Sequence, residues 1–104
     1  MVARVASFEG VNVEAAERTI DQAVSIITPL MEGLPGYQGH FELVAPDGKV
    51  LSIALFDSDE NAQAAEPTFD DEMPRQLGDL YKDWEGSRVS VERYKVLSES
   101  RARQ

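Results

Sequence analysis

Few residues of this chain could perform chemistry, and two of them lie close together. His40 is the only histidine, and Glu42 follows two residues later in an expected strand. Because alternate residues of a strand share a face, the pair could act as a histidine base that a carboxylate orients. Tyr81 is the second candidate for a base. The alternative for His40 is an ordinary hydrogen-bonded residue at a rim or interface.

Aromatic residues form a second group. Phe69, Tyr81 and Trp84 fall within an expected helical segment, 69–84, where they could wall a pocket for a flat ligand. The competing interpretation is structural, because an apolar stripe at helical spacing usually packs into the core. Both interpretations place these side chains between the helix and the rest of the fold.

Other chemistries are disfavoured by what the sequence contains. The absence of cysteine rules out a thiolate metal site, a disulfide framework and a cysteine nucleophile. A single histidine cannot form a histidine cluster, and the run Asp70-Asp71-Glu72 lacks the ligand spacing and glycine turn of a calcium loop. There is no glycine-rich phosphate loop and no GxSxG motif. We therefore expect no metal and no bound cofactor.

The charge of the chain also limits the classes of partner that it could bind. The net charge is −9, which disfavours a nucleic-acid partner. Ten of the 19 acidic residues lie between Asp57 and Glu85, where we expect a solvated helix surface. No apolar run reaches membrane-spanning length, and the first residues lack the apolar core of a signal peptide. The expectation is a cytoplasmic protein without a membrane partner.

The clearest local signal is a hairpin. Ala45-Pro46-Asp47-Gly48 is typical of a tight turn between two strands. The second of these strands is apolar on both faces, so we expect it to be buried on both sides. Pro67 should interrupt the helix that follows. The expected strands are 2–8, 37–44, 49–56 and 88–96, and the expected helices are 13–31 and 59–84 with a break at Pro67.

This order predicts an α+β fold of the ferredoxin-like βαββαβ type. Its four-stranded antiparallel sheet would carry two helices on one face. The other face would then expose apolar residues to water, and the economical solution is a second copy packed sheet to sheet. We expect one domain over residues 1–97, a polar tail over 98–104, and a homodimer formed through the sheet faces.

The hairpin Gly36–Glu60 and the closing strand Ser90–Val96 resemble the dimeric α+β barrel superfamily, and more narrowly its antibiotic-biosynthesis-monooxygenase (ABM)-like domains. The resemblance implies a dimeric barrel with a pocket in each subunit, between sheet and helices. Members include cofactor-free oxygenases of aromatic polyketides, haem-degrading enzymes and proteins without established activity. It therefore implies a small apolar or aromatic ligand.

The functional residues of the family carry over poorly. Haem-degrading members surround the porphyrin with Asn, Trp and His, whereas Ser7, Phe56 and Glu66 stand at the corresponding positions here. Polyketide oxygenases often share that Trp and add an Asn at the position of Ser52. The pocket residues that we expect are Ser7, Ser52, Phe56, Phe69, Tyr81 and Trp84.

Two functions remain open at this point. The first is binding of a small apolar or aromatic molecule, with cofactor-independent monooxygenation as the reaction. The second is a non-catalytic dimer that senses a ligand or supports an assembly. A buried polar group in an enclosed cavity would favour the enzyme, and a filled cavity would favour the structural dimer.

Overall fold

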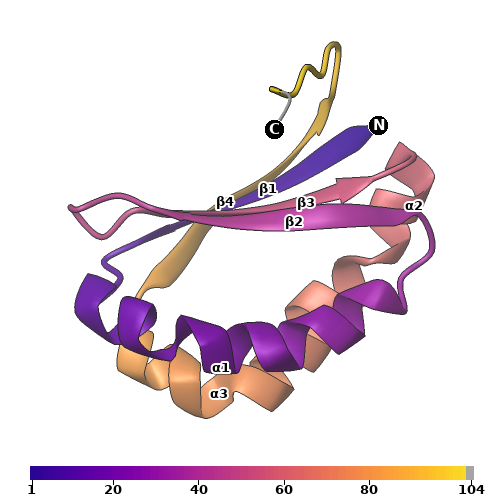
Figure 1. Ribbon diagram of the computed structural model, residues 1–104. Coiled ribbons are helices and arrows are strands. Elements are labelled where there is room, and N and C mark those ends of the chain that lie inside the picture. The colour runs from indigo at the N-terminus through magenta and orange to yellow at the C-terminus, as the bar shows by residue number, and fades with distance from the viewer. Residues whose placement is uncertain (103–104) are drawn as a thin grey trace.

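A computed structural model describes residues 1–102, and residues 103 and 104 of the expected tail lie outside them. The chain folds into one sheet covered by helices on one side (Figure 1). In chain order the elements are β1 (Val2–Glu9), α1 (Val13–Glu32), β2 (Tyr37–Val44), β3 (Val50–Phe56), α2 (Asp59–Ala64), the π-helical turn η1 (Thr68–Glu72), α3 (Met73–Trp84) and β4 (Ser87–Lys95). The expected βαββαβ order is confirmed.

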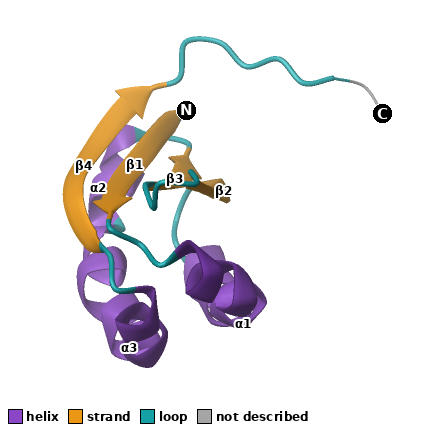
Figure 2. Ribbon diagram, turned by 90° about the vertical axis from the view of Figure 1, so that its left-hand side faces the viewer, coloured by secondary structure: helices purple, strands orange, loops and turns teal. Residues whose placement is uncertain are grey.

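The sheet is antiparallel, with strand order β2-β3-β1-β4. Figure 2 shows α1 and α3 together on one side of it. The turn between β2 and β3 is the predicted one, with the Gly48 amide donating to the Ala45 carbonyl at 3.0 Å. Gly48 has a φ of +90°, and a Cβ there would meet the Val11 carbonyl oxygen at 2.7 Å. The position therefore requires glycine.

The pairing register fixes which side chains meet the helices. Ala54 of β3 pairs with Arg4 of β1 and with His40 of β2. Ala54 and Arg4 are each 2% exposed, so this alternation of residues faces the helices. Phe56, two residues beyond Ala54, is fully buried in the core with Met31 and Leu77.

The open face of the sheet is apolar. Phe41 and Leu43 of β2 and Tyr94 of β4 are about half exposed, and Ile53 and Leu55 of β3 lie between them in the register. No helix among residues 1–102 covers these side chains. The structure therefore has the unpaired apolar face on which the expectation of a homodimer depends.

The expected break in the second helical segment is present. Pro67 lacks the amide hydrogen that would continue α2, and Pro74 cannot donate to the carbonyl of Asp70. Between them the chain adopts η1, with the Met73 amide donating to the Thr68 carbonyl. One turn is thus wound wider than an α-helix, which changes the directions of Phe69 and Asp70.

From the sequence we expected the acidic residues between Asp57 and Glu85 to form a solvated helix surface. In the structure, some of them also form ion pairs. Three of their carboxylates, which lie in α2, in η1 and between them, pair with arginines of β1 and β4. The pairs are Arg4 with Glu66 at 2.8 Å, Arg88 with Asp70 at 2.8 Å and Arg93 with Asp59 at 2.7 Å. The Arg4 guanidinium also lies 3.8 Å from the centre of the Phe69 ring, so it is both paired and stacked.

Candidate functional site

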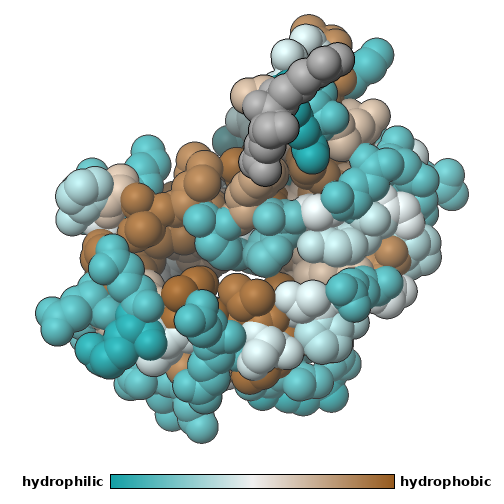
Figure 3. Space-filling model, in the orientation of Figure 1, coloured by the Kyte–Doolittle hydropathy of each residue, from teal (hydrophilic) through white to brown (hydrophobic). Residues whose placement is uncertain are grey.

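A cavity of about 270 Å³ lies between the sheet and the helices α1 and α3. Figure 3 shows apolar side chains bordering the hollow between these two layers. Most of the lining is aliphatic or aromatic. The lining residues are Phe8, Val11, Ala16, Glu17, Ile20, Ile27, Glu42, Leu43, Val44, Val50, Ser52, Met73, Tyr81, Trp84 and Gly86.

The cavity exists because small residues face it. In β3, Ser52 and Val50 occupy the helix-facing positions that Ala54 and Phe56 occupy further along. Across from them, Ala16 of α1 contributes one methyl group. Asn12 fixes the start of α1, since its side chain accepts the Ala15 amide at 3.1 Å. The Asn12 amide in turn donates to the Trp84 carbonyl at 2.7 Å, which ties this end of α1 to α3.

Glu42 is the best-oriented polar group of the cavity. Its Oε1 accepts a hydrogen bond from Ser52 Oγ at 2.8 Å and lies 3.2 Å from His40 Nε2. The His40 and Glu42 side chains are 13% and 26% exposed. Within residues 1–102, Oε2 of Glu42 accepts no hydrogen bond. One oxygen therefore holds the carboxylate in place, and the other remains for a ligand.

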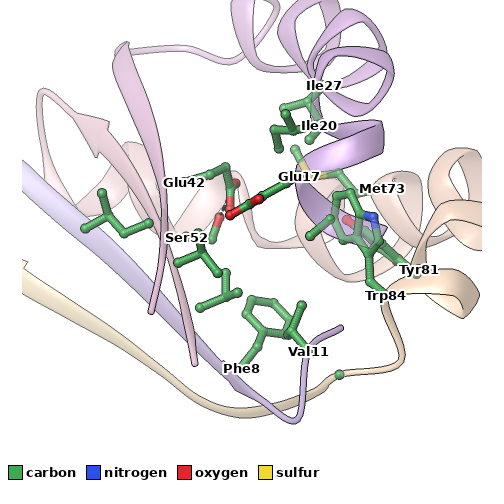
Figure 4. A pocket seen from close by; sticks show the side chains of 15 residues that line it. Phe8, Val11, Glu17, Ile20, Ile27, Glu42, Ser52, Met73, Tyr81 and Trp84 are labelled. Carbon is green, nitrogen blue, oxygen red and sulfur yellow. Dashed lines mark hydrogen bonds between the residues drawn. The ribbon is translucent and has the colours of Figure 1, made fainter. Parts of the chain in front are cut away.

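Glu17 is the second carboxylate of the cavity. It comes from the first turns of α1, and Figure 4 shows its side chain pointing across the cavity toward Glu42 and Ser52. No Lys or Arg lines the cavity. Its polar groups include two carboxylates and the hydroxyls of Ser52 and Tyr81, which suits a ligand with hydrogen-bond donors and opposes an anionic one.

Tyr81 and Trp84 form an aromatic part of the cavity lining. Their ring centres lie 5.6 Å apart. Trp84 Nε1 donates to Thr19 Oγ1 at 2.7 Å, and Thr19 donates to the Ala15 carbonyl at 2.8 Å. The indole N–H is therefore already used, and Trp84 offers a ligand its ring surface alone.

Tyr81 has the environment of a donor and not of a base. Burial, and secondarily the charge of Glu42, raises the pKa of the Tyr81 hydroxyl to about 12. The group thus keeps its proton at neutral pH. Tyr81 could donate a hydrogen bond to a ligand, but the role of proton acceptor that we considered from sequence does not suit it.

The other expected site residues divide among three places. Ser52 lines the cavity with Tyr81 and Trp84, whereas His40 stands behind Glu42 and does not line it. Ser7 pairs with Leu51 and Ser90 on the open face of the sheet, so its expected place in the pocket is wrong. Phe56 is fully buried in the core, edge-on to Tyr37 and Phe69, and its assignment to the pocket lining is wrong for that reason.

Phe69 lies with Arg4, outside the lining of this cavity. Glu66, aligned with the family's histidine, is held by Arg4. Sequence reasoning missed Glu17 as a cavity residue, because a charged residue beside the apolar stripe of α1 normally faces solvent. No group of three His, Cys, Asp or Glu side chains in residues 1–102 could hold a metal ion, and no helix in that range is long and apolar enough to cross a membrane.

Comparison with known proteins finds similarity in structure but not in sequence. No protein-family model matches the chain, and no curated protein matches it significantly. A candidate antibiotic biosynthesis monooxygenase from Deinococcus radiodurans superposes with a TM-score of 0.63 and 13% identity, over all of both chains. A dimeric ferredoxin-like protein from an uncultured marine organism gives 0.69 and 16%, over 97% of this chain and 98% of that one.

The heme-degrader MhuD from Mycobacterium tuberculosis, solved with two hemes in its active site, gives a TM-score of 0.66 and 17% identity. The match covers 96% of this chain and 99% of MhuD. These similarities confirm the fold predicted from sequence, which is the ferredoxin-like fold of ABM-type monooxygenases and of this heme-degrading enzyme. At such identities they describe the fold alone.

Proposed function

We propose that the chain is an ABM-like homodimeric protein that binds a small aromatic molecule bearing a hydrogen-bond donor. The observation that carries this proposal is the cavity itself, whose lining is apolar except for two carboxylates and the hydroxyls of Ser52 and Tyr81. Apolar walls with a few placed polar groups are the usual composition of a small-molecule site. The ring of the ligand would lie against Trp84 and Tyr81, and its donor would meet Oε2 of Glu42.

Size and charge favour a ligand smaller than haem. Pockets for drug-sized molecules span roughly 300–1,000 Å³, and this cavity, at about 270 Å³, lies just below that range. A haem carries two carboxylates, which Glu17 and Glu42 would repel. No histidine lines the cavity to bind iron. The residues therefore do not fit haem, and a compact aromatic alcohol or amine suits them better.

The binding proposal can be tested with a simple aromatic alcohol. We expect naphthol to bind the wild-type protein in isothermal calorimetry. We expect Glu42→Gln to weaken binding about tenfold, because a hydrogen bond to a charged group contributes roughly 1.5–3 kcal/mol. Glu9→Gln is the control, because it removes the same negative charge from an exposed position at the end of β1, and it should leave binding unchanged. Equal binding by the two variants would contradict the role of Glu42.

The arrangement of Glu42 and His40 favours cofactor-independent monooxygenation as the reaction. Glu42 is a fixed carboxylate in an apolar cavity, with His40 behind it to pass a proton toward solvent. In such a reaction the carboxylate takes a proton from an activated CH₂ of the substrate. The resulting carbanion reduces O₂, a C–O bond forms, and cleavage of the O–O bond leaves a ketone and one water. The substrate supplies all the electrons, so the protein excludes water, orients and deprotonates.

Oxygen uptake with anthrone distinguishes the enzyme from the non-catalytic dimer. If the chain is an enzyme, Glu42→Gln should reduce uptake by at least a hundredfold, within the usual range for loss of a general base. His40→Ala should reduce it less, and Tyr81→Phe should spare the proton-transfer step. Naphthol binding without any uptake of oxygen would support the ligand-sensing alternative.

The homodimer rests on the open face of the sheet. Phe41, Leu43 and Tyr94 expose about half of their surface there, and the dimeric ferredoxin-like neighbour has the same fold. We expect a dimer in analytical ultracentrifugation at micromolar concentration. Phe41→Asp should dissociate it, whereas Val24→Asp on the outer side of α1 should not. A wild-type monomer would overturn this part of the proposal.

A further inference from the structure

A second cavity, of about 310 Å³, adjoins the first. It lies between the β1–β4 pair and the segment formed by η1 and α3, and its lining is Phe8, Phe69, Asp70, Pro74, Tyr81 and Arg88. Phe8 and Tyr81 also line the first cavity. These two side chains are therefore the boundary at which the cavities meet.

The two cavities differ in charge. The first contains carboxylates and no cation, whereas the second contains the guanidinium of Arg88. Arg88 Nη1 donates to Asp70 Oδ1 at 2.8 Å, and both side chains are nearly half exposed. No other hydrogen bond engages the Arg88 guanidinium within residues 1–102. Because exposed ion pairs are weak, a ligand carboxylate could replace Asp70 at small cost.

Two irregularities of the backbone direct side chains into this second cavity. The pairing of β1 with β4 shifts between Ser7 and Phe8, so that Phe8 pairs with Arg88 and Val89 is the extra residue. Without this bulge the alternation would turn Arg88 to the open face. On the other side, the π turn η1 carries Phe69 and Asp70. Bulges and π turns are both frequent at functional sites.

We propose that the second cavity is a subsite for the carboxylate of an elongated ligand, whose aromatic end occupies the first cavity. A short chain would pass between Phe8 and Tyr81, and the carboxylate would pair with Arg88. The proposal rests on the function proposed above and narrows its ligand class. The ligand would be an aromatic alcohol with a carboxylate-terminated side chain, and its two ends would meet opposite charges.

The test uses a naphthol that bears a carboxypropyl chain, together with its methyl ester as an uncharged probe of nearly the same length. We expect the wild-type protein to bind the acid roughly two- to fivefold more tightly than the ester at low salt, as for an exposed ion pair. Arg88→Gln should remove this preference. Asp70→Asn should enlarge the preference for the acid by releasing Arg88. Asp71→Asn removes the same charge from an exposed position in the same turn and should not enlarge it.

The outcomes separate this inference from the proposed function. If the ester binds but the acid gains nothing over it, the subsite is wrong and the binding cavity stands. The same conclusion follows if Arg88→Gln weakens acid and ester equally, or if Asp70→Asn and Asp71→Asn act alike. If neither naphthol probe nor naphthol itself binds the wild-type protein, the proposed function fails and the subsite with it.

Discussion

The space between sheet and helices is filled at one end and hollow at the other. At the filled end, β3 contributes Ala54 and Phe56, which pack against the C-terminal half of α1 and the first turns of α3. At the hollow end the same strand contributes Val50 and Ser52, opposite Ala16. The elements are continuous from one end to the other, so only the side chains differ.

This difference shows how one scaffold combines stability with binding. Large buried side chains at the filled end supply the apolar burial that stabilises the fold. The hollow end lacks that burial, and there Ser52 donates a hydrogen bond that holds Glu42 in place. We therefore expect substitutions at the filled end to change stability, and substitutions at the hollow end to change binding. Four predictions test this division, in order of decreasing effect.

The largest effect should come from removing a core phenylalanine. Phe56→Ala should lower the free energy of unfolding by about 3–5 kcal/mol, the usual cost for a fully buried Phe. Phe8→Ala at the hollow end should cost only about 1–2 kcal/mol, because Phe8 is half-buried and already faces cavities. Urea unfolding measures both values. Similar losses would show that the two ends are equally important for stability.

The next effect concerns the ion pair under the π turn. Arg4→Met should cost about 2 kcal/mol, less than a fully buried pair, because the Glu66 side chain is 27% exposed. Adding Glu66→Met should restore part of the loss, since no unpaired carboxylate would remain. If the double variant were less stable than the single one, the unpaired Glu66 carboxylate would not be the source of the loss.

A smaller change in free energy should result from filling the cavity. Ala16→Phe places a ring in the cavity, so we expect naphthol affinity to fall at least about tenfold, or about 1.4 kcal/mol. The stability of the fold should change little, because the added ring occupies empty space. Val24→Phe on the exposed side of α1 is the control for a phenylalanine added to this helix. Unchanged affinity in Ala16→Phe would place the ligand elsewhere.

The smallest effect at neutral pH comes from the Tyr81 hydroxyl. Its pKa rises from the ordinary 10.0 to about 12 in the folded protein, so folding favours the protonated form. The associated stability is fully present below pH 10 and is lost as the pH rises toward 12. Urea unfolding on both sides of pH 10 should show this loss, and Tyr81→Phe should reduce it. Tyr37 and Tyr94 also have raised pKa values, and the variant retains both.

Much of the fold was predictable because its signals are local. The turn Ala45-Pro46-Asp47-Gly48 forms where its residue types require it, and β2 has the expected bounds. Pro67 ends the regular helix because it lacks an amide hydrogen. The apolar alternation of β3 indicated a face that no helix of this chain would cover. Each of these inferences depends on a few neighbouring residues.

The site was less predictable because it depends on pairing between distant segments. Ser7 was aligned to a pocket position, yet one step in strand register decides which face it occupies. Glu17 lies beside the apolar stripe of α1. It lines the cavity only because the small side chain of Ser52 leaves space between the sheet and α1. The bulge at Val89 contains no glycine and gives no warning in the sequence. Such features emerge only when the strands are paired.

Trp84 has a practical consequence for work on this protein. It is the only tryptophan of the chain, its ring forms part of the cavity wall, and its N–H is fixed by Thr19. Its fluorescence therefore comes from one known position with one hydrogen-bonding state. Quenching or a shift of that emission would report on occupancy of the cavity directly, without any label, and would allow unknown compounds to be screened against the native chain.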